Sequence, residues 1–406
     1  MAKNKQADVV VIGGGAVGTS AAYHLAARGM SVILCEARNI ASGASGRCGG
    51  QVIHAFARDV NIDKIDYRLK VTRANTEIYK EYQKSFELDF EFRQVGLLDI
   101  SITEEEFGEL ERLIEIQRSL GDDEIKLLTK KETLEVMPNL NPDMVSGSRW
   151  RESDGNLNPY KLCWAQAVEA QKLGAEILTH TKVEDIVIEK NRVKGVRVKD
   201  GIIESEYVVN ATNAWSSSLT KGMEVIPVRE MAMVTERLPE LPPQAFEMLC
   251  FGDYAYGATQ TASGNYNLGG PAPNYPPDPY DERIYPEEVL RVMSYINTIF
   301  PSLEEVSVIR SWVGIMALTP DGMASIGPMP GVEGLFIAVP DGAGMSYAGI
   351  TGKITAEYIC DGKTSIPIDL LNPGRFIGKP KMKWPKPYDI TSCHKFICDE
   401  ESRYKK

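Results

Sequence analysis

Three glycines near the N-terminus could cradle a phosphate group. Gly13, Gly15 and Gly18 follow the β-branched run 8–12 at the spacing GxGxxG. In that spacing the first glycine permits a tight turn, the second lets a pyrophosphate approach the backbone, and the third lets a helix pack closely on the strand. The N–H groups at the start of the helix then point toward the phosphates. The cofactor contacts expected here are Gly13, Gly15, Ala16, Val17 and Gly18.

A carboxylate marks the end of the second strand of the same unit. Glu36 follows the apolar run 31–35, eighteen residues after Gly18, and Gly29 ends the helix between them. A carboxylate at this position accepts hydrogen bonds from an adenosine ribose and disfavours a 2′-phosphate, which argues against NADP. The alternative is a glycine-rich turn in an unrelated α/β domain, with Glu36 solvated. The complete strand-helix-strand pattern favours the dinucleotide site.

The segment after Glu36 favours FAD over NAD. Residues 37–52, ARNIASGASGRCGGQV, form a glycine- and serine-rich loop where an NAD domain would continue its alternation of strands and helices. Such a loop offers backbone N–H groups and hydroxyls to a flavin that lies extended across the protein. A flexible surface loop is the alternative for residues 42–45. The expected contacts are Glu36, Ala37, Gly43, Ala44, Ser45, Arg47, Gly49, Gly50 and Gln51.

The composition is that of a globular protein with a large core and two lobes. The chain has 406 residues, of which 43% are hydrophobic and 25% charged, and its formal net charge is -11. An acidic balance argues against nucleic acid or an anionic membrane as the main partner. The apolar run at the N-terminus is too short for a membrane span or a signal segment, so we expect a cytoplasmic location. Seven scattered cysteines without a CxxC pair predict neither a disulfide framework nor a metal site, and Cys393, His394 and Cys398 are too few ligands for one.

Beyond these motifs, the sequence up to Phe376 resembles the D-amino-acid oxidase-like family of FAD-dependent oxidoreductases. Asn158 is expected to cap a helix, and residues 182–198 read as two strands. The segment 208–217, VVNATNAWSS, is similar to the family's second flavin contact, with Asn213 at a glycine position where asparagine tolerates a left-handed backbone. The resemblance implies cofactor contacts at Val183, Ala211, Thr212 and Trp215.

The last segment that resembles a flavin contact is residues 319–359. An apolar strand at 335–339 leads into a glycine-rich loop and then a helix expected to begin near Gly349. In the family this step places backbone N–H groups at the pyrimidine end of the flavin, where negative charge accumulates on reduction. Many members have histidine at the position of Ala343. The implied contacts are Gly314, Gly342, Gly344, Met345 and Ser346.

Met316 departs from the glycine oxidase and D-amino-acid oxidase pattern. Those relatives have an arginine there that holds a substrate carboxylate in two bonds. An apolar residue is more similar to the β-subunits of heteromeric sarcosine oxidases and dye-linked proline dehydrogenases, and to the flavin subunits of opine oxidase and hydrogen cyanide synthase. A carboxylate would then need another cation, and the candidates are Arg47, Arg58, Arg229 and Arg310. Arg47 is favoured as a flavin contact, and Arg310 is alternatively a brace for its strand.

The predicted substrate pocket contains residues from several segments. They are Tyr254, Tyr256, Met316, Arg310 and His54. The tyrosines lie two apart on one face of a strand, with core aromatics as the alternative, and His54 is alternatively a structural histidine. No catalytic residue is assigned, because oxidation of an amine at flavin N5 needs a neutral lone pair and an aimed C–H but no acid-base dyad.

The fold class is α/β, or α+β overall: a Rossmann-like FAD-binding domain interleaved with an antiparallel-sheet substrate domain. Capping boxes at Thr103 with Glu106 and at Thr129 with Glu132 start two helices, and 227–236 reads as a strand. The expected ranges are 1–63, 147–222 and 306–376 for the FAD-binding domain, 64–146 and 223–305 for the substrate domain, and 377–406 for a C-terminal extension.

The resemblance implies FAD-dependent oxidation of a C–N bond in a small amino or imino acid, of the proline, hydroxyproline, sarcosine, glycine or opine type. It also implies a hetero-oligomer with an α-subunit and a small iron–sulfur or electron-acceptor subunit. Residues 377–406 are a solvated tail or a partner-docking strap. Two alternatives remain: an FAD-binding assembly or electron-transfer protein without catalysis, and a 2-hydroxy-acid dehydrogenase, which would bring a histidine base to the flavin.

Overall fold

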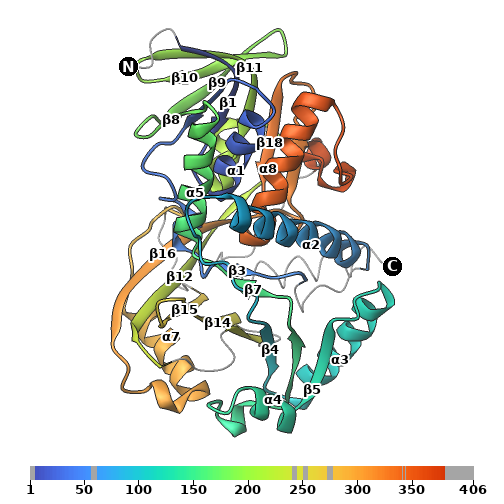
Figure 1. The fold of residues 1–406 in the computed structure, drawn as a ribbon, viewed down its shortest axis with the longest axis vertical. Helices are drawn as coiled ribbons and strands as arrows, with labels where there is room; N and C mark the ends of the chain where they lie inside the picture. Colours follow the sequence, from blue (N-terminus) through green and yellow to red (C-terminus); the bar gives the residue numbers. More distant parts are fainter. Residues whose placement is uncertain are drawn as a thin grey trace.

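The computed structural model describes residues 5–55, 62–239, 245–249, 255–271, 278–340, 342 and 344–379. These residues fold around two large sheets of eight strands each, one in each lobe of the molecule (Figure 1). The predicted α/β class is confirmed. In this part of the chain no helix is both long and apolar enough to cross a bilayer, and no cluster of three His, Cys, Asp or Glu side chains could hold a metal.

The first sheet contains the predicted dinucleotide unit. Its strand order is β17-β18-β11-β1-β2-β8, and β10 and β9 extend it from β11. Parallel pairing joins β18, β11, β1, β2 and β8, so their carboxyl ends meet at one edge, where ligands of open α/β sheets bind. The bounds are β1 Lys5–Ile12, β2 Val32–Cys35, β8 Glu176–Leu178, β9 Val183–Glu189, β10 Arg192–Val198, β11 Gly201–Asn210, β17 Ser325–Pro328 and β18 Leu335–Val339.

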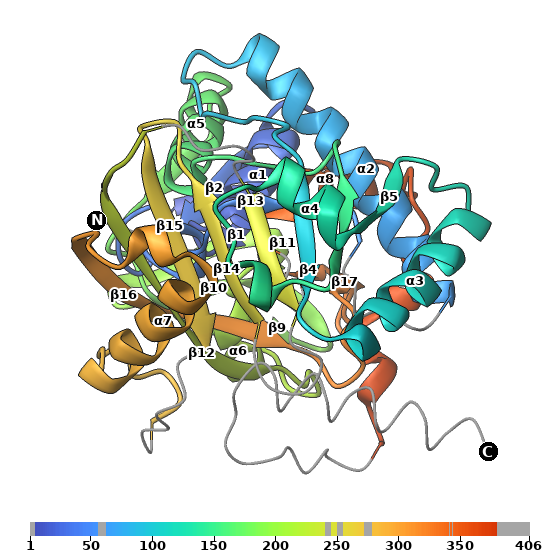
Figure 2. The ribbon, with the colours of Figure 1, turned by 90° about the horizontal axis from the view of Figure 1, so that it is seen from below.

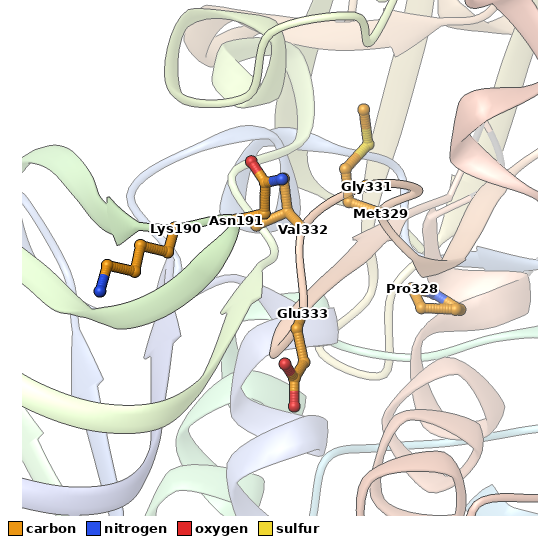
Figure 3. A pocket seen from close by; sticks show the side chains of 7 residues that line it. All are labelled: Lys190, Asn191, Pro328, Met329, Gly331, Val332 and Glu333. Carbon is orange, nitrogen blue, oxygen red and sulfur yellow. The ribbon is translucent and has the colours of Figure 1, made fainter.

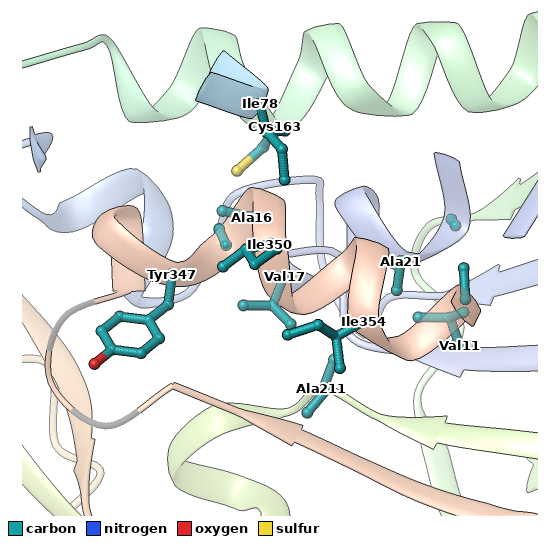
Figure 4. Close-up of a cluster of buried hydrophobic side chains, with 14 of the residues drawn as sticks. Val11, Ala16, Val17, Ala21, Ile78, Cys163, Ala211, Tyr347, Ile350 and Ile354 are labelled. Carbon is teal, nitrogen blue, oxygen red and sulfur yellow. The ribbon is translucent and has the colours of Figure 1, made fainter. Parts of the chain in front are cut away.

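Helices α1, α5 and α8 pack together beside the first sheet, and α2 packs on α8 (Figure 1). Small and branched side chains make the α1 and α8 contact close: Val17 and Ala21 lie beside Ile350 and Ile354 (Figure 4). Asn158 caps α5 as predicted, since its side chain accepts a hydrogen bond from Lys161 N. The bounds are α1 Ala16–Ala26, α2 Ile62–Ser85, α5 Pro159–Lys172 and α8 Gly344–Asp361.

The start of α8 corrects a prediction. The helix was expected to begin near Gly349 and begins at Gly344. Gly342, with φ +55°, turns the chain just before it. The first turn is then fixed by α2, because Asn75 Nδ2 and Tyr79 Oη both donate hydrogen bonds to Met345 O, at 3.1 and 2.6 Å. These tertiary bonds outweigh the low helix propensity of the glycine-rich segment.

The second sheet is mostly antiparallel and is covered on one face by α7, α3 and α4 (Figure 2). Its order is β16-β12-β15-β14-β13-β4-β6-β5. Both predicted capping boxes form, at the starts of α3 and α4. The bounds are β4 Leu97–Ser101, β5 Ile125–Thr129, β6 Gly147–Arg151, β12 Ile226–Arg237, β13 Ala245–Leu249, β14 Ala255–Gln260, β15 Asn265–Pro271, β16 Val308–Leu318, α3 Glu104–Ser119, α4 Lys130–Val136 and α7 Pro286–Ile299.

Short elements join the two lobes. β3 and β7 form a small two-stranded sheet, and η1 contacts both α5 and β16. The bounds are β3 Gln51–Val52, β7 Gly155–Asn156, α6 Ser216–Leu219, and the 3₁₀ turns η1 Ala44–Arg47, η2 Pro142–Met144, η3 Asn213–Trp215, η4 Pro301–Leu303, η5 Asp369–Leu371 and η6 Pro373–Phe376.

The register of β12 and β16 decides which side chains face the cofactor lobe. Met231 pairs with Val313 across the two strands, and both side chains lie in the core cluster that contains α7 residues. Side chains alternate along a strand, so the intervening positions face the opposite way. Trp312 belongs to this second set, and its Nε1 donates a hydrogen bond to Arg47 O of η1 at 2.7 Å. We call this second set cofactor-facing. It consists of the side chains of Val228, Glu230, Ala232, Trp312 and Met316, and Gly314 lies between the last two.

Two strands of the second sheet lie in ranges that are expected for the FAD-binding domain. β6 lies within 147–222 and β16 within 306–376, both expected for the FAD-binding domain, yet both pair in the second sheet. The second sheet therefore extends past the expected boundaries at 147 and 306. The reason is that strand pairing is long-range: β6 bonds to β4 and β5, whereas its local sequence reads only as a short strand.

We expect Gly352→Ala to destabilise the protein by separating α1 from α8. A Cβ at residue 352 would lie 2.2 Å from Ser20 Oγ and 2.5 Å from Ser20 backbone carbon. Overpacking of this kind costs roughly 1–3 kcal/mol of unfolding free energy. The matched control is Gly108→Ala in α3, where an added Cβ has no neighbour within 4 Å. Better helix propensity should make that variant more stable by up to about 1 kcal/mol. Urea denaturation of both variants measures the difference, and shifts of the same sign would contradict the packing argument.

Candidate cofactor and substrate site

The glycine turn after β1 is built for close backbone approach. Gly13 has φ +107°, and a Cβ there would lie 2.7 Å from Ala211 O. A Cβ on Gly18 would lie 1.9 Å from Gly13 O, so no larger residue fits. Ala211 directly follows β11, the strand beside β1. The turn and the start of α1 therefore lie against the carboxyl end of β11, with helix N–H groups directed outward for an anion.

Glu36 is held beside the same turn. Its Oε2 accepts a hydrogen bond from Gly14 N at 2.7 Å, and its Oε1 accepts one from Arg38 N at 2.7 Å. Two backbone donors thus fix the carboxylate just after β2. This is the position from which an acid reaches the ribose of a dinucleotide.

The loop after Glu36 folds back over the glycine turn. Ser45 Oγ accepts a hydrogen bond from Ala16 N, the first residue of α1, at 3.0 Å. Gly50 has φ +74°, and a Cβ on it would lie 2.1 Å from Leu157 O. Arg47 ties the loop to the second sheet, since its Nη1 donates to Val313 O at 2.7 Å and its Nη2 pairs with Glu282 at 2.8 Å. The structure therefore brings this loop between the dinucleotide turn and β16.

Further segments predicted to contact the cofactor are placed as follows. Asn213 has φ +50°, so the left-handed turn predicted for it is confirmed. Ser346, in the first turn of α8, accepts a hydrogen bond from Ile53 N at 2.8 Å and so joins α8 to the end of the loop. Val183 begins β9 and is buried. Gly314 packs on η1, since a Cβ on it would lie 3.3 Å from Arg47 Cβ.

Some predicted substrate residues are used elsewhere in the protein. His54 is 3% exposed, with Nδ1 2.7 Å from Asp154 Oδ1 and Nε2 3.1 Å from Thr76 Oγ1. Both ring nitrogens have partners, as in the structural alternative. Arg229 is 3% exposed and pairs with Glu288 of α7 at 2.9 Å, on the face of β12 that points away from the cofactor lobe. Arg310 is exposed, with its guanidinium 5.7 Å from the centre of the Trp312 ring.

The other predicted pocket residues are placed as follows. Met316 pairs with Val228 on the cofactor-facing set and is partly buried. Tyr256 lies in β14, where its backbone pairs with Met248. Tyr254 and Arg58 lie outside the described residues, as does Ala343.

Glu230 was missed by sequence reasoning. It pairs with Gly314 in the middle of the cofactor-facing set, and it is partly buried. Burial raises the pKa of its carboxyl group to about 7. Burial also raises the pKa of the Cys48 thiol, next to η1, to about 11, with a smaller contribution in the same direction from Glu230. The signal in the sequence was a single acid inside the apolar strand PVREMAMV, at an alternating position.

A surface hollow lies away from these segments. It has a volume of about 450 Å³ and sits where the β9–β10 turn meets the β17–β18 connection (Figure 3). Glu333 N donates a hydrogen bond to Asn191 O there, at 2.8 Å. Its lining residues are Lys190, Asn191, Pro328, Met329, Gly331, Val332 and Glu333. None of the predicted cofactor or substrate residues lines it, so we do not assign the substrate to this hollow.

Comparison with known families decides the identity of the fold. The family model described as "FAD dependent oxidoreductase", DAO, matches residues 8–358. The chain belongs to this family. Its cofactor is therefore FAD, in agreement with the glycine turn, Glu36 and the loop that follows. The predicted family, cofactor and enzyme class, an FAD-dependent oxidoreductase acting on C–N bonds, are confirmed.

Similar proteins of known activity span the family. The crystal structure of L-proline dehydrogenase from P. horikoshii is 32% identical, with a TM-score of 0.81, and the match covers 92% of this chain and 98% of that one. Glycine oxidase of Geobacillus kaustophilus is 27% identical over 378 residues, 92% of this chain and 98% of the relative. Human mitochondrial dimethylglycine dehydrogenase is 25% identical over 397 residues, 91% of this chain. This chain covers 44% of that relative, or about half its length.

The arrangement assigns binding roles to the chain's own residues. FAD, when bound, is the two-electron oxidant that accepts a hydride from the substrate carbon. The glycine turn and the start of α1 would hold its pyrophosphate, and Glu36 would hold its ribose. Ser45 bonds to the start of α1, Arg47 bonds to β16, and the first turn of α8 bonds to Ile53 at the end of the loop. These three parts would hold the flavin end. The cofactor-facing residues of β12 and β16 would then form the opposite wall and would orient the substrate.

We expect Glu36→Gln to weaken FAD binding roughly tenfold or more, because the variant loses the charge that strengthens hydrogen bonds to this acid. Glutamine also has an NH2 group in place of one oxygen, and this group would face either Gly14 N or Arg38 N, which are both donors. Titration of the apoprotein into FAD, followed by flavin fluorescence, measures the dissociation constant. The control is Glu176→Gln on the neighbouring strand β8, an exposed acid paired with Lys5, which should bind FAD like the parent. Equal affinity for both variants would remove Glu36 from the cofactor site.

Proposed function

We propose that the protein uses FAD to oxidise the C–N bond of a small amino or imino acid, with a hydride passing from the carbon next to nitrogen to flavin N5. Proline, hydroxyproline, sarcosine, glycine and opines are the substrate types considered. The proposal is supported by the family and by likeness to proteins named L-proline dehydrogenase and glycine oxidase. The single observation that carries the proposal is the wall that β12 and β16 form opposite the expected flavin.

That wall suits an amine better than a hydroxy acid. Within Val228 to Ala232 and Trp312 to Met316, the ionisable side chain facing the cofactor lobe is Glu230. A 2-hydroxy-acid dehydrogenase needs a base for the hydroxyl proton and usually brings histidine. Both ring nitrogens of His54 are engaged, by Asp154 and by Thr76. These stretches of β12 and β16 contain no histidine, so the 2-hydroxy-acid alternative lacks the base that such enzymes usually use.

The partners follow from the same proposal. An α-subunit and a small iron–sulfur or electron-acceptor subunit would receive the electrons, as in the heteromeric enzymes that the sequence resembles. Of the expected extension 377–406, the structure describes residues 377–379. The segment 380–406 lies outside the described residues, so its role as tail or docking strap stays a prediction. The cytoplasmic location likewise stays a prediction.

The test is anaerobic titration of the FAD-loaded protein with L- and D-proline, 4-hydroxyproline, sarcosine, glycine and an opine. We expect one of these amines to bleach the flavin absorption band, because hydride transfer reduces the flavin. 2-Hydroxy acids of matched size serve as controls and should leave the band unchanged.

Two further outcomes decide between the alternatives. Slow return of the band in air after bleaching would mark a dehydrogenase that needs a partner, and fast return would mark an oxidase. A flavin band that persists against every amine would overturn the proposal in favour of a non-catalytic FAD-binding protein, whereas bleaching by a hydroxy acid alone would favour the 2-hydroxy-acid dehydrogenase.

A further inference from the structure

Glu230 lies where a substrate nitrogen could be recognised. Its partner across the strand pair is Gly314, which has no side chain to cover it. Gly314 in turn contacts Arg47 of η1, so the acid faces the loop expected to hold the flavin end. The neighbouring wall positions are apolar or aromatic, among them Ala232 and Met316. A partly buried carboxylate thus stands in an apolar wall, directed toward the cofactor lobe.

Within the described parts of the chain, the charged and titratable groups that face Glu230 supply no counter-ion to its carboxylate. The groups from η1 and the residue after it are Arg47 and Cys48. On the neighbouring strands, Glu230 pairs with Gly314 of β16 and with Pro271 of β15, and neither of these residues is titratable. Arg47 is already held by Val313 O and Glu282. Burial raises the pKa of the Cys48 thiol to about 11, so it carries no charge at neutral pH. Among the described residues, the Glu230 carboxyl has neither a hydrogen-bond donor nor an ion-pair partner.

We propose that the Glu230 carboxylate binds the protonated nitrogen of the substrate, so that this site selects substrates by their ammonium group rather than by their carboxylate. The inference rests on the proposed amine oxidation. It fits the absence of an arginine at residue 316: Met316 pairs with Val228, and the next position of β12 on the same face carries the Glu230 carboxylate. A carboxylate with an unsatisfied charge is completed by an ammonium, which donates up to three hydrogen bonds to it.

The same contact can prepare the amine for oxidation. One N–H proton passes from the substrate ammonium to a Glu230 carboxylate oxygen, which leaves a neutral amine and a neutral carboxylic acid. The carbon next to nitrogen then gives up its hydrogen with the bonding electron pair to FAD, and the nitrogen lone pair forms the C=N bond of a protonated imine. The substrate loses two electrons and two hydrogens in all. Burial raises the pKa of Glu230 to about 7, which suits a group that must be ionised to bind and protonated after transfer.

The experiment uses two probes of the same shape that cannot be oxidised. tert-Butylammonium has no hydrogen on the carbon next to nitrogen, and pivalate carries a carboxylate in place of the ammonium. Binding of each to the FAD-loaded protein is followed by the shift of the flavin band. We expect Glu230→Gln to weaken tert-butylammonium binding about ten- to hundred-fold and to strengthen pivalate binding, since a charge-assisted contact is lost and a repulsion removed. Glu236→Gln, an exposed acid on the same strand, is the matched control and should change neither.

The pH profile separates this role from a structural one. tert-Butylammonium binding to the parent should weaken as pH falls through about 7, because the carboxyl becomes neutral, and the Gln variant should show no such change. Folding is checked by thermal unfolding. A raised pKa means that the folded state holds its proton more tightly, so the parent loses stability as pH rises from about 4.5 to about 7. The Gln variant carries no charge there and should be at least as stable as the parent at pH 8.

Each outcome decides one of the two proposals. If an amine bleaches the flavin but Glu230→Gln binds both probes like the parent, the ammonium-binding role is wrong and amine oxidation stands. If the probe selectivity inverts as expected but no amine bleaches the flavin, the site binds ammonium and the oxidation is wrong. A folded parent that binds neither probe, or that prefers pivalate, would also overturn the role of Glu230.

Discussion

The close approach of the first glycine turn to the end of β11 is the constraint on which the site depends. Gly13 and Gly18 leave room for backbone atoms at distances that no Cβ permits, with Ala211 on the other side. This contact sets α1 against the parallel strands and directs its N–H groups to the sheet edge. Glu36 and the loop after it are then held by bonds to Gly14 and Ala16. Loss of that contact would displace every segment that follows.

The second constraint is the alternation of side chains on β12 and β16. On one face, Arg229 pairs with Glu288 and joins the sheet to α7. On the other face, one residue further along the same strand, Glu230 has no such partner among the described residues. The two-residue period of a strand thus separates a charge that stabilises the fold from a charge exposed to the cofactor lobe. Arg47 connects the two lobes at this point through Val313 O.

Local signals were predictable from the sequence, whereas pairings between distant segments were not. The strand-helix-strand unit, the helix cap at Asn158 and the left-handed turn at Asn213 each depend on neighbouring residues, and all are present. The start of α8 depends on donors from α2, about 270 residues away in sequence, and the sequence pattern placed it at Gly349 instead of Gly344. The pairing of β6 and β16 within the second sheet likewise depends on strands far away in sequence. Glu230 was overlooked because its meaning depends on which face of β12 it occupies, and only the register with β16 defines that face.

Buried charges elsewhere in the described chain show what is unusual about Glu230. Arg149 pairs with Asp99, and Arg151 pairs with Asp122, so the desolvation of each ion is offset by a neighbour of opposite sign. An acid in an apolar wall without such a neighbour lowers stability whenever it is ionised. A purely structural position would accept an apolar residue there at no loss, since the adjacent wall residues are apolar already. A carboxylate that lowers the stability of the free protein fits a site whose counter-ion arrives with the ligand. Such a site selects an ammonium over a carboxylate.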